Sequence, residues 1–276
     1  MQTYSKKKRL GGNMLYIVFI LFTLPLLGLY LYHNTTQVKL ERICISSDKI
    51  KGNLKILHLS DHHFNKIGRL EKKIIAYLQK EEFDILVLTG DYLRNITYIN
   101  EFTVFLKKLN LNQPAFAVSG DNDYSINPVL WQEFFEESGI TFLANQGLSI
   151  NIAGNTINII GVESPGIADD LNKSLGSLDL KDTYNIILSH TYDILESVKE
   201  EMEIDLILVG DTHGGQINFP LIGKRLLDYL FRFDFLKGLY HLGNTYLYVN
   251  RGLGTSALHF RLRCSPEIAL IEVNGS

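Results

Sequence analysis

Five short apolar runs, each ending in a small residue followed by Asp or His, constrain the fold of this 276-residue chain more than any other feature. Runs of Leu, Ile and Val without polar alternation are typical of strands that are buried on both faces of a sheet. In open α/β sheets, functional side chains lie at the carboxyl ends of such strands. The five runs cover residues 54–63, 85–91, 115–123, 185–191 and 206–213. The pattern predicts an α/β fold in which polar side chains gather at one sheet edge.

The residues that end these runs are of the types that bind metal ions. A single Gly-Asp after a strand is most often a turn or a helix N-cap, and a lone His is usually a satisfied, hydrogen-bonded residue. Five such positions at one edge would bury so much charge that a divalent cation is the usual means of offsetting it. The set comprises Asp61, His63, Asp91, Asp121, His190, Asp211 and His213. We therefore predict a metal site that holds two ions.

The N-terminal region predicts a membrane anchor. Residues 14–32 contain no charged side chain and are long enough to cross a bilayer as a single helix, and a basic segment, residues 1–13, precedes them. The positive-inside rule then places the N-terminus in the cytoplasm and residues 33–276 outside it, with the cytoplasmic face as the alternative. A cleaved signal peptide is the rival interpretation, but no small-x-small cleavage pattern follows Tyr32.

Apolar periodicity predicts the remaining elements of residues 33–276, which we expect to form one domain. Helices are expected over residues 69–82, 100–109, 131–138, 171–178 and 192–201, and further strands over 37–46, 147–162 (a hairpin), 245–249 and 268–273. The last two strands are expected in a second sheet packed on the first. Cys44 and Cys264 are expected to be buried thiols, with a disulfide as the alternative. The net charge of -3 gives no basic footprint, so we expect no nucleic-acid partner.

The order of the motifs resembles that of the calcineurin-like metallophosphoesterases: Asp-x-His, Gly-Asp, Gly-Asn-His-Asp, His and Gly-His-x-His, here over residues 54–273. The segments Gly214-Gly215-Gln216 and Gly252-Leu253-Gly254-Thr255-Ser256 are similar to those of a membrane-associated bacterial branch. The resemblance implies a four-layered α/β/β/α sandwich and a dinuclear metal centre. It also implies hydrolysis of a phosphodiester or pyrophosphate bond.

The resemblance assigns the ligands to two ions. One ion would be held by Asp61, His63, Asp91 and His213, and the other by Asp91, Asp121, His190 and Asp211, with Asp91 as the bridge. Asp121 stands where the family has Asn, and Asp211 replaces the first His of Gly-His-x-His. The additional carboxylates favour Mn²⁺ or Mg²⁺, with Zn²⁺ and Fe as the other candidates.

A third departure concerns catalysis. Asn122 occupies the position of the family's histidine, and an amide can donate a hydrogen bond but cannot supply a proton to a leaving group. We expect Asn122 to contact a phosphate oxygen and the substrate to carry a leaving group that departs as a stable anion. UDP-2,3-diacylglucosamine, the lipid pyrophosphate cleaved by hydrolases of the family that also lack this histidine, is one such substrate. His62 is either a substitute acid or an incidental exposed residue.

Two interpretations are left open by the sequence. The basic, aromatic segment of residues 221–240 is expected either to lie on a bilayer or to pack on its own domain. The three motif departures also suit a metal-binding or phospholipid-binding protein with weak or no turnover, as the alternative to a hydrolase.

Overall fold

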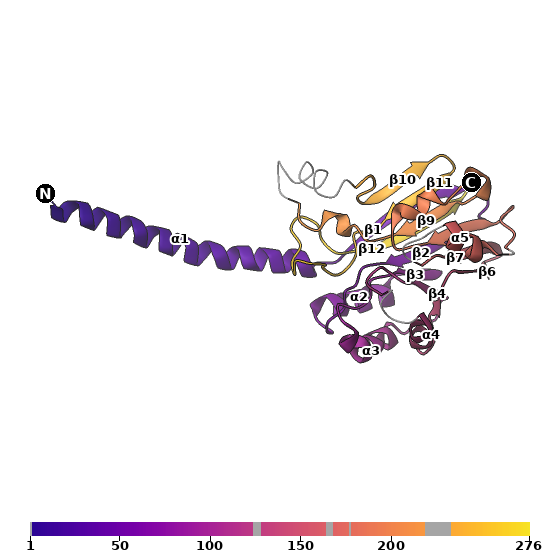
Figure 1. The fold of residues 1–276 in the computed structure, drawn as a ribbon, viewed down its shortest axis with the longest axis horizontal. Coiled ribbons are helices and arrows are strands. Elements are labelled where there is room, and N and C mark those ends of the chain that lie inside the picture. The colour runs from indigo at the N-terminus through magenta and orange to yellow at the C-terminus, as the bar shows by residue number, and fades with distance from the viewer. Residues whose placement is uncertain (1, 124–127, 164–167, 177, 219–232) are drawn as a thin grey trace.

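The computed structural model describes residues 2–123, 128–163, 168–176, 178–218 and 233–276. A long N-terminal helix is followed by two six-stranded sheets that pack face to face, with helices on the outer faces (Figure 1). The predicted α/β/β/α sandwich is confirmed. Its apolar side chains form three layers, one between the sheets and one on each outer face.

The first sheet has the strand order β1-β12-β2-β3-β4-β5. Its members are β1 (Lys39–Ser47), β12 (Glu267–Gly275), β2 (Asn53–Leu59), β3 (Ile85–Thr89), β4 (Ala115–Val118) and β5 (Thr141–Phe142). Strands β2 to β5 are parallel, whereas β12 is antiparallel to β2. Every residue of β3 and β4 is buried, which is why these strands appear in the sequence as unbroken apolar runs.

The second sheet has the strand order β10-β11-β9-β8-β7-β6. Its members are β10 (Gly238–Leu242), β11 (Thr245–Val249), β9 (Leu206–Val209), β8 (Tyr184–Leu188), β7 (Asn155–Gly161) and β6 (Gln146–Ile152). Strands β11, β9, β8 and β7 are parallel. The predicted β6–β7 hairpin turns at Ala153 and Gly154, whose φ angles of 50° and 80° suit a tight hairpin turn.

Helices cover the outer face of each sheet. On the first sheet lie α2 (Arg69–Lys80), α3 (Ile99–Leu109) and α4 (Pro128–Glu136); on the second lie α5 (Ala168–Leu175) and the 3₁₀ turns η2 (Tyr192–Glu196) and η3 (Glu200–Met202). The remaining 3₁₀ turns are η1 (Ile96–Tyr98) and η4 (His213–Gly215).

Several local expectations were wrong. The helix expected over 192–201 is two 3₁₀ turns, and strand β12 lies between β1 and β2 in the first sheet rather than in a second one. Cys264 is buried, but Cys44 is exposed, and both are free thiols. Most of the segment 221–240 lies outside the described residues; its last three residues begin strand β10.

Helix α1 (Gln2–Thr36) extends away from the sheets (Figure 1). Its portion Val18–Thr36 is long and apolar enough to cross a membrane, with a mean hydropathy of 1.4 and none of the window buried against the domain. The helix ends beside the sheets, where Val38 is 1% exposed and Gln37 accepts a hydrogen bond from Lys73 of α2. The apolar helix is therefore attached directly to the folded domain.

The layer between the sheets should dominate stability. Ile186 of β8 is 0% exposed in that layer, so Ile186→Ala should lower the free energy of unfolding by about 2–5 kcal/mol. Val104→Ala is the control, because Val104 on α3 is 48% exposed and its truncation should change stability by only about 0.5 kcal/mol. Urea unfolding of the detergent-solubilised chain measures both. Equal losses in the two variants would contradict this account of the core.

Candidate metal centre

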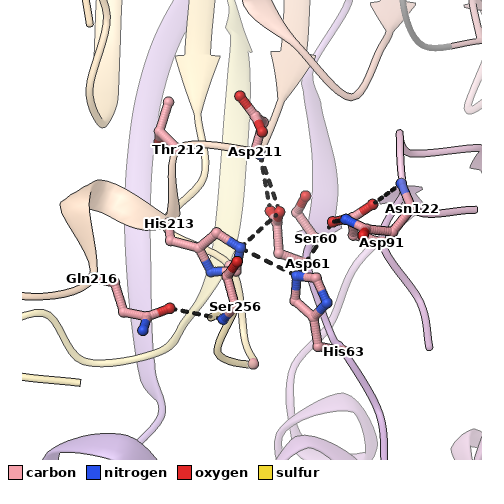
Figure 2. Close-up of polar contacts among 12 residues, drawn as sticks. Ser60, Asp61, His63, Asp91, Asn122, Asp211, Thr212, His213, Gln216 and Ser256 are labelled. Atoms are coloured by element: carbon pink, nitrogen blue, oxygen red, sulfur yellow. Dashed lines mark hydrogen bonds and ion pairs between the residues drawn. The ribbon is translucent and has the colours of Figure 1, made fainter. Parts of the chain in front are cut away.

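The structure brings all seven predicted ligand residues together. Asp61 and His63 follow β2, Asp91 follows β3, and Asp121 follows β4, while the second sheet contributes His190 after β8 and both Asp211 and His213 after β9. Figure 2 shows Asp61, His63 and Asp91, which follow strands of the first sheet, beside Asp211 and His213, which follow a strand of the second. The residues therefore converge from two sheets, and not along the edge of a single sheet as the sequence suggested.

The backbone turns sharply at five of these residues. Their φ angles lie in the left-handed region that residues other than glycine seldom adopt: Asp61 (49°), His63 (43°), Asp91 (57°), Asp211 (67°) and His213 (52°). Backbone strain of this kind persists only where the surrounding structure enforces it, and it clusters at functional sites. The turns direct the side chains of separate strands into one small volume.

The first candidate ligand group consists of Asp61, His63 and His213, each of which has one ligand atom within 4.8 Å of the others. The Nε2 atoms of His63 and His213 lie 3.2 Å apart, and His213 Nε2 lies 3.5 Å from Asp61 Oδ1. Burial lowers the pKa of both imidazoles, that of His63 to about 3, so both rings are neutral. A neutral imidazole is the form that binds a metal ion.

The second group is built around His190, which is fully buried. Its Nδ1 lies 2.7 Å from the carbonyl oxygen of Thr89, an arrangement that fixes the ring of many ligating histidines. Its Nε2 is buried and has no hydrogen-bond partner within the described part of the chain. Around that nitrogen lie four carboxylate oxygens, from Asp91 (3.5 Å), Asp121 (3.6 Å), Asp61 (4.0 Å) and Asp211 (4.0 Å). A cation bound among them would satisfy both the nitrogen and the carboxylates.

Asp91 lies between the two groups. Its Oδ2 is 3.3 Å from His63 Nε2, and its Oδ1 is 3.5 Å from His190 Nε2. One carboxylate thus presents a different oxygen to each group, which is the arrangement that a bridging ligand requires. Asp61 also belongs to both groups, as the sequence had not suggested.

The electrostatics of the cluster favour a cation. Burial raises the pKa of Asp61 to about 6 and that of Asp91 to about 8, and the repulsion of neighbouring carboxylates acts in the same direction. Burial opposes a charge on His190, but the nearby Asp121 carboxylate and the charges of the other carboxylates raise its pKa well above the usual value. Without a metal ion, Asp91 and His190 therefore retain protons near neutral pH, and Asp61 retains its proton in mildly acidic solution.

Asp123 supports the site and was not predicted. Its side chain is buried and accepts hydrogen bonds from the backbone N–H groups of Asp91 (2.7 Å), Tyr92 (3.2 Å) and Gly120 (2.9 Å). These bonds hold the left-handed turn at Asp91 beside the loop that carries Asp121. The signal was available, since Asp123 is the last residue of the motif that the chain shares with Gly-Asn-His-Asp.

Asn122 and His62 occupy different environments. The Asn122 amide donates to Asp91 Oδ2 (2.6 Å) and Asp121 Oδ1 (2.9 Å), so it lies within the ligand cluster. His62 packs against Phe102 and Phe105, and its Nε2 lies 3.3 Å from the Glu71 carboxylate of α2. The expectation of an exposed His62 was wrong, and the pairing with Glu71 gives no support to its use as a substitute acid.

Replacing the carboxylate that faces both groups should weaken the binding of both ions. Asp91→Asn removes the negative charge while retaining the shape, so binding of Mn²⁺ and hydrolysis of a bis-aryl phosphate should both fall by at least about tenfold. Asn95→Ala is the control, because Asn95 is exposed and caps only the 3₁₀ turn η1. An Asp91→Asn chain that retains two tightly bound ions would contradict the bridging geometry.

Metal binding should release protons. Folding raises the pKa of Asp61 from 3.8 to about 6 and that of Asp91 from 3.8 to about 8, so their contribution to the stability of the metal-free chain is present below pH 3.8 and is lost as the pH rises through these folded values. A metal ion needs both carboxylates ionised, so Mn²⁺ affinity should rise over the same interval. Calorimetric titrations in buffers of different ionisation enthalpy measure the released protons. Binding heats that do not depend on the buffer would contradict proton release.

Comparisons with known proteins agree with the geometry. The sequence profile of the family described as calcineurin-like phosphoesterase matches residues 54–215. The chain is 30% identical to the uncharacterized metallophosphoesterase YkoQ of Bacillus subtilis, over 87% of this chain and 92% of YkoQ. It is 30% identical to an uncharacterized metallophosphoesterase of Aquifex aeolicus, over 92% of this chain and 99% of that protein. It is 29% identical to the phosphodiesterase YaeI of Escherichia coli, over 79% and 82% of the two chains.

The profile match spans more than half of the chain, and the similarity to YkoQ spans most of both proteins. Both matches include the strand ends at which the candidate ligands converge. The chain therefore belongs to the calcineurin-like phosphoesterase family, and is a hydrolase of phosphoesters.

Proposed function

We propose that this chain is a membrane-anchored, dinuclear metal-dependent phosphohydrolase that cleaves a phosphodiester or pyrophosphate bond. The observation that carries the proposal is the position of Asp91, whose two carboxylate oxygens face His63 and His190 respectively. A single carboxylate placed between two ligand groups suits two ions, rather than one ion and a structural ion pair. The similarity to YaeI, which is named a phosphodiesterase, supports the class of bond.

The ligand set favours an oxygen-preferring metal. Four of the seven residues are aspartates, and Asp121 and Asp211 are the two that are partly open to solvent, with side chains 60% and 36% exposed. Mn²⁺ or Mg²⁺ suits such a set better than softer metals. When bound, two such ions supply Lewis-acid polarisation of the phosphoryl group and a water of lowered pKa.

Positive charge beside the first ligand group suits an anionic substrate. Arg94 is close enough to His63 to contribute to the lowering of its pKa. It donates hydrogen bonds to the carbonyl (2.8 Å) and hydroxyl (2.9 Å) oxygens of Thr255, and no described carboxylate lies within ion-pair distance of it. A phosphate group that enters the site would therefore meet a cation whose charge is not already balanced by an ion pair.

The leaving group follows from the chemistry of Asn122. Its amide and backbone N–H donate to Asp91, which places this residue at the cluster where a phosphate oxygen would bind. An amide cannot transfer a proton to a leaving group, so a substrate whose leaving group departs as a stable anion is favoured. A pyrophosphate, whose leaving group is a phosphate, meets this requirement.

A lipid-linked substrate fits the attachment of the domain to an apolar helix. The portion Val18–Thr36 is exposed, apolar and long enough to span a bilayer, and basic residues precede it in the sequence. The positive-inside rule favours a catalytic domain outside the cytoplasm. A lipid pyrophosphate such as UDP-2,3-diacylglucosamine combines a good leaving group with a membrane location.

The dependence of rate on the leaving group tests the role of Asn122. With Mn²⁺ supplied, the wild-type chain should hydrolyse aryl phosphodiesters and pyrophosphates much faster than alkyl phosphodiesters. Asn122→His should lower the ratio of the aryl rate to the alkyl rate by about 10²–10⁴-fold, because a histidine can protonate the alkoxide that leaves an alkyl substrate. Steady-state rates on matched aryl and alkyl diesters measure the effect.

Asn122→Gln provides the control for this test, since it changes the shape of the side chain without adding an acid. It should alter all rates by a common factor. If Asn122→His also changed all rates by a common factor, the residue would only bind phosphate, and the argument for a pyrophosphate-like substrate would fail. Absence of hydrolysis of every substrate by a wild-type chain that binds Mn²⁺ would favour the alternative of a binding protein.

A further inference from the structure

Arg261 is a buried cation without a carboxylate partner in the part of the chain that the structure describes. Its side chain is 0% exposed, and its guanidinium donates instead to main-chain carbonyl oxygens of Gly254 (2.7 Å), Arg251 (2.8 Å) and His213 (3.3 Å). Burial of an arginine without a counter-ion is costly, so these bonds must offset a substantial penalty. Two of these carbonyls lie in one segment, 7 and 10 residues before Arg261, whereas the third belongs to His213, 48 residues away in the sequence.

Two of these contacts lead to the first candidate ligand group. Arg261 Nη1 contacts the carbonyl of His213, and Nη2 lies 3.4 Å from Nδ1 of the same residue. The Gly254 segment lies against Asp61, because Gly254 N donates to the Asp61 carbonyl at 2.7 Å. A Cβ atom at Gly254 would overlap the backbone of His62, so the segment packs on the ligand loop without spare space. Arg261 therefore links the loops that carry Asp61 and His213.

The third connection leads to the N-terminal helix. The backbone N–H of Arg261 donates to Thr35 Oγ1 at 2.9 Å, and the same hydroxyl donates to the Leu31 carbonyl at 2.7 Å. Thr35 lies in the last turn of α1, where helix carbonyls no longer have partners in the helix. The hydroxyl thus joins the end of α1 to the residue that links the two ligand loops.

We propose that Arg261 is a positioning residue for His213 and Asp61, and that the last turn of α1 holds Arg261 in place through Thr35. The proposal rests on the metal centre described under the proposed function. It goes further because the last turn of α1 would help to position the metal ligands, in addition to attaching the domain to a membrane. Loss of the Arg261 guanidinium or of the Thr35 hydroxyl should weaken the ion beside His63 and His213 more than the other ion, because Arg261 contacts His213 directly, whereas Asp61 faces both groups.

Mn²⁺ titration of the full chain in detergent, followed by electron paramagnetic resonance, gives the two affinities separately from any hydrolysis. Arg261→Met keeps the unbranched apolar stem of the side chain and removes its donors, so the affinity for one ion should fall by about 10–100-fold. Thr35→Val removes the bond to Arg261 together with the bond to the Leu31 carbonyl, and should weaken the same ion by about fivefold. Thr35→Ser, which keeps the hydroxyl, should retain the wild-type affinity.

Thr36→Val is the matched control, because the Thr36 hydroxyl donates only to the Tyr32 carbonyl within the helix. It should bind both ions like the wild type. A folded Arg261→Met chain with two unchanged affinities would overturn the proposal. If Arg261→Met does not fold, an unchanged Thr35→Val chain, or equal weakening in Thr35→Val and Thr36→Val, would overturn it. A wild-type chain that binds no Mn²⁺ would contradict the metal centre itself.

Discussion

The structure is organised around one electrostatic constraint: four carboxylates must lie close to a single buried imidazole nitrogen, Nε2 of His190. That nitrogen has no hydrogen-bond partner in the described structure, while the opposite nitrogen is held by the Thr89 carbonyl. Such a cluster is stable only with protons or with cations, and the raised pKa values of Asp61 and Asp91 show the cost of ionising it without a metal ion. Binding of divalent ions removes that cost.

The surrounding fold brings the four carboxylates and His190 together through fixed strand ends and turns. Two sheets pack face to face so that the carboxyl ends of their central strands meet, and five left-handed turns direct the ligands inward. Separate buried residues hold the loops that carry the ligands. Asp123 holds the turn at Asp91 through backbone N–H groups, and Arg261 holds the loops of Asp61 and His213 through backbone carbonyls. The charge of each supporting residue suits the backbone groups that it binds.

The sequence predicted what depends on local pattern. Unbroken apolar runs identified the five strands, and the polar residues that follow them identified the seven residues that the structure brings together. The sequence pattern did not predict features that depend on contacts between distant segments. The insertion of β12 between β1 and β2, the burial of His62 and the role of Arg261 all depend on contacts with distant segments, which a linear pattern does not contain. The 3₁₀ turns over 192–201 show tertiary packing overriding an apolar spacing that suggested a helix.

Anomalous diffraction at the manganese edge, on crystals of the full chain grown with Mn²⁺, tests the central claim most directly. The account predicts two manganese peaks about 3.5–4 Å apart, one beside His63 and His213 and the other beside His190, with Asp91 bound to both. A single peak at full occupancy, or two peaks of which only one contacts Asp91, would contradict the bridged dinuclear centre.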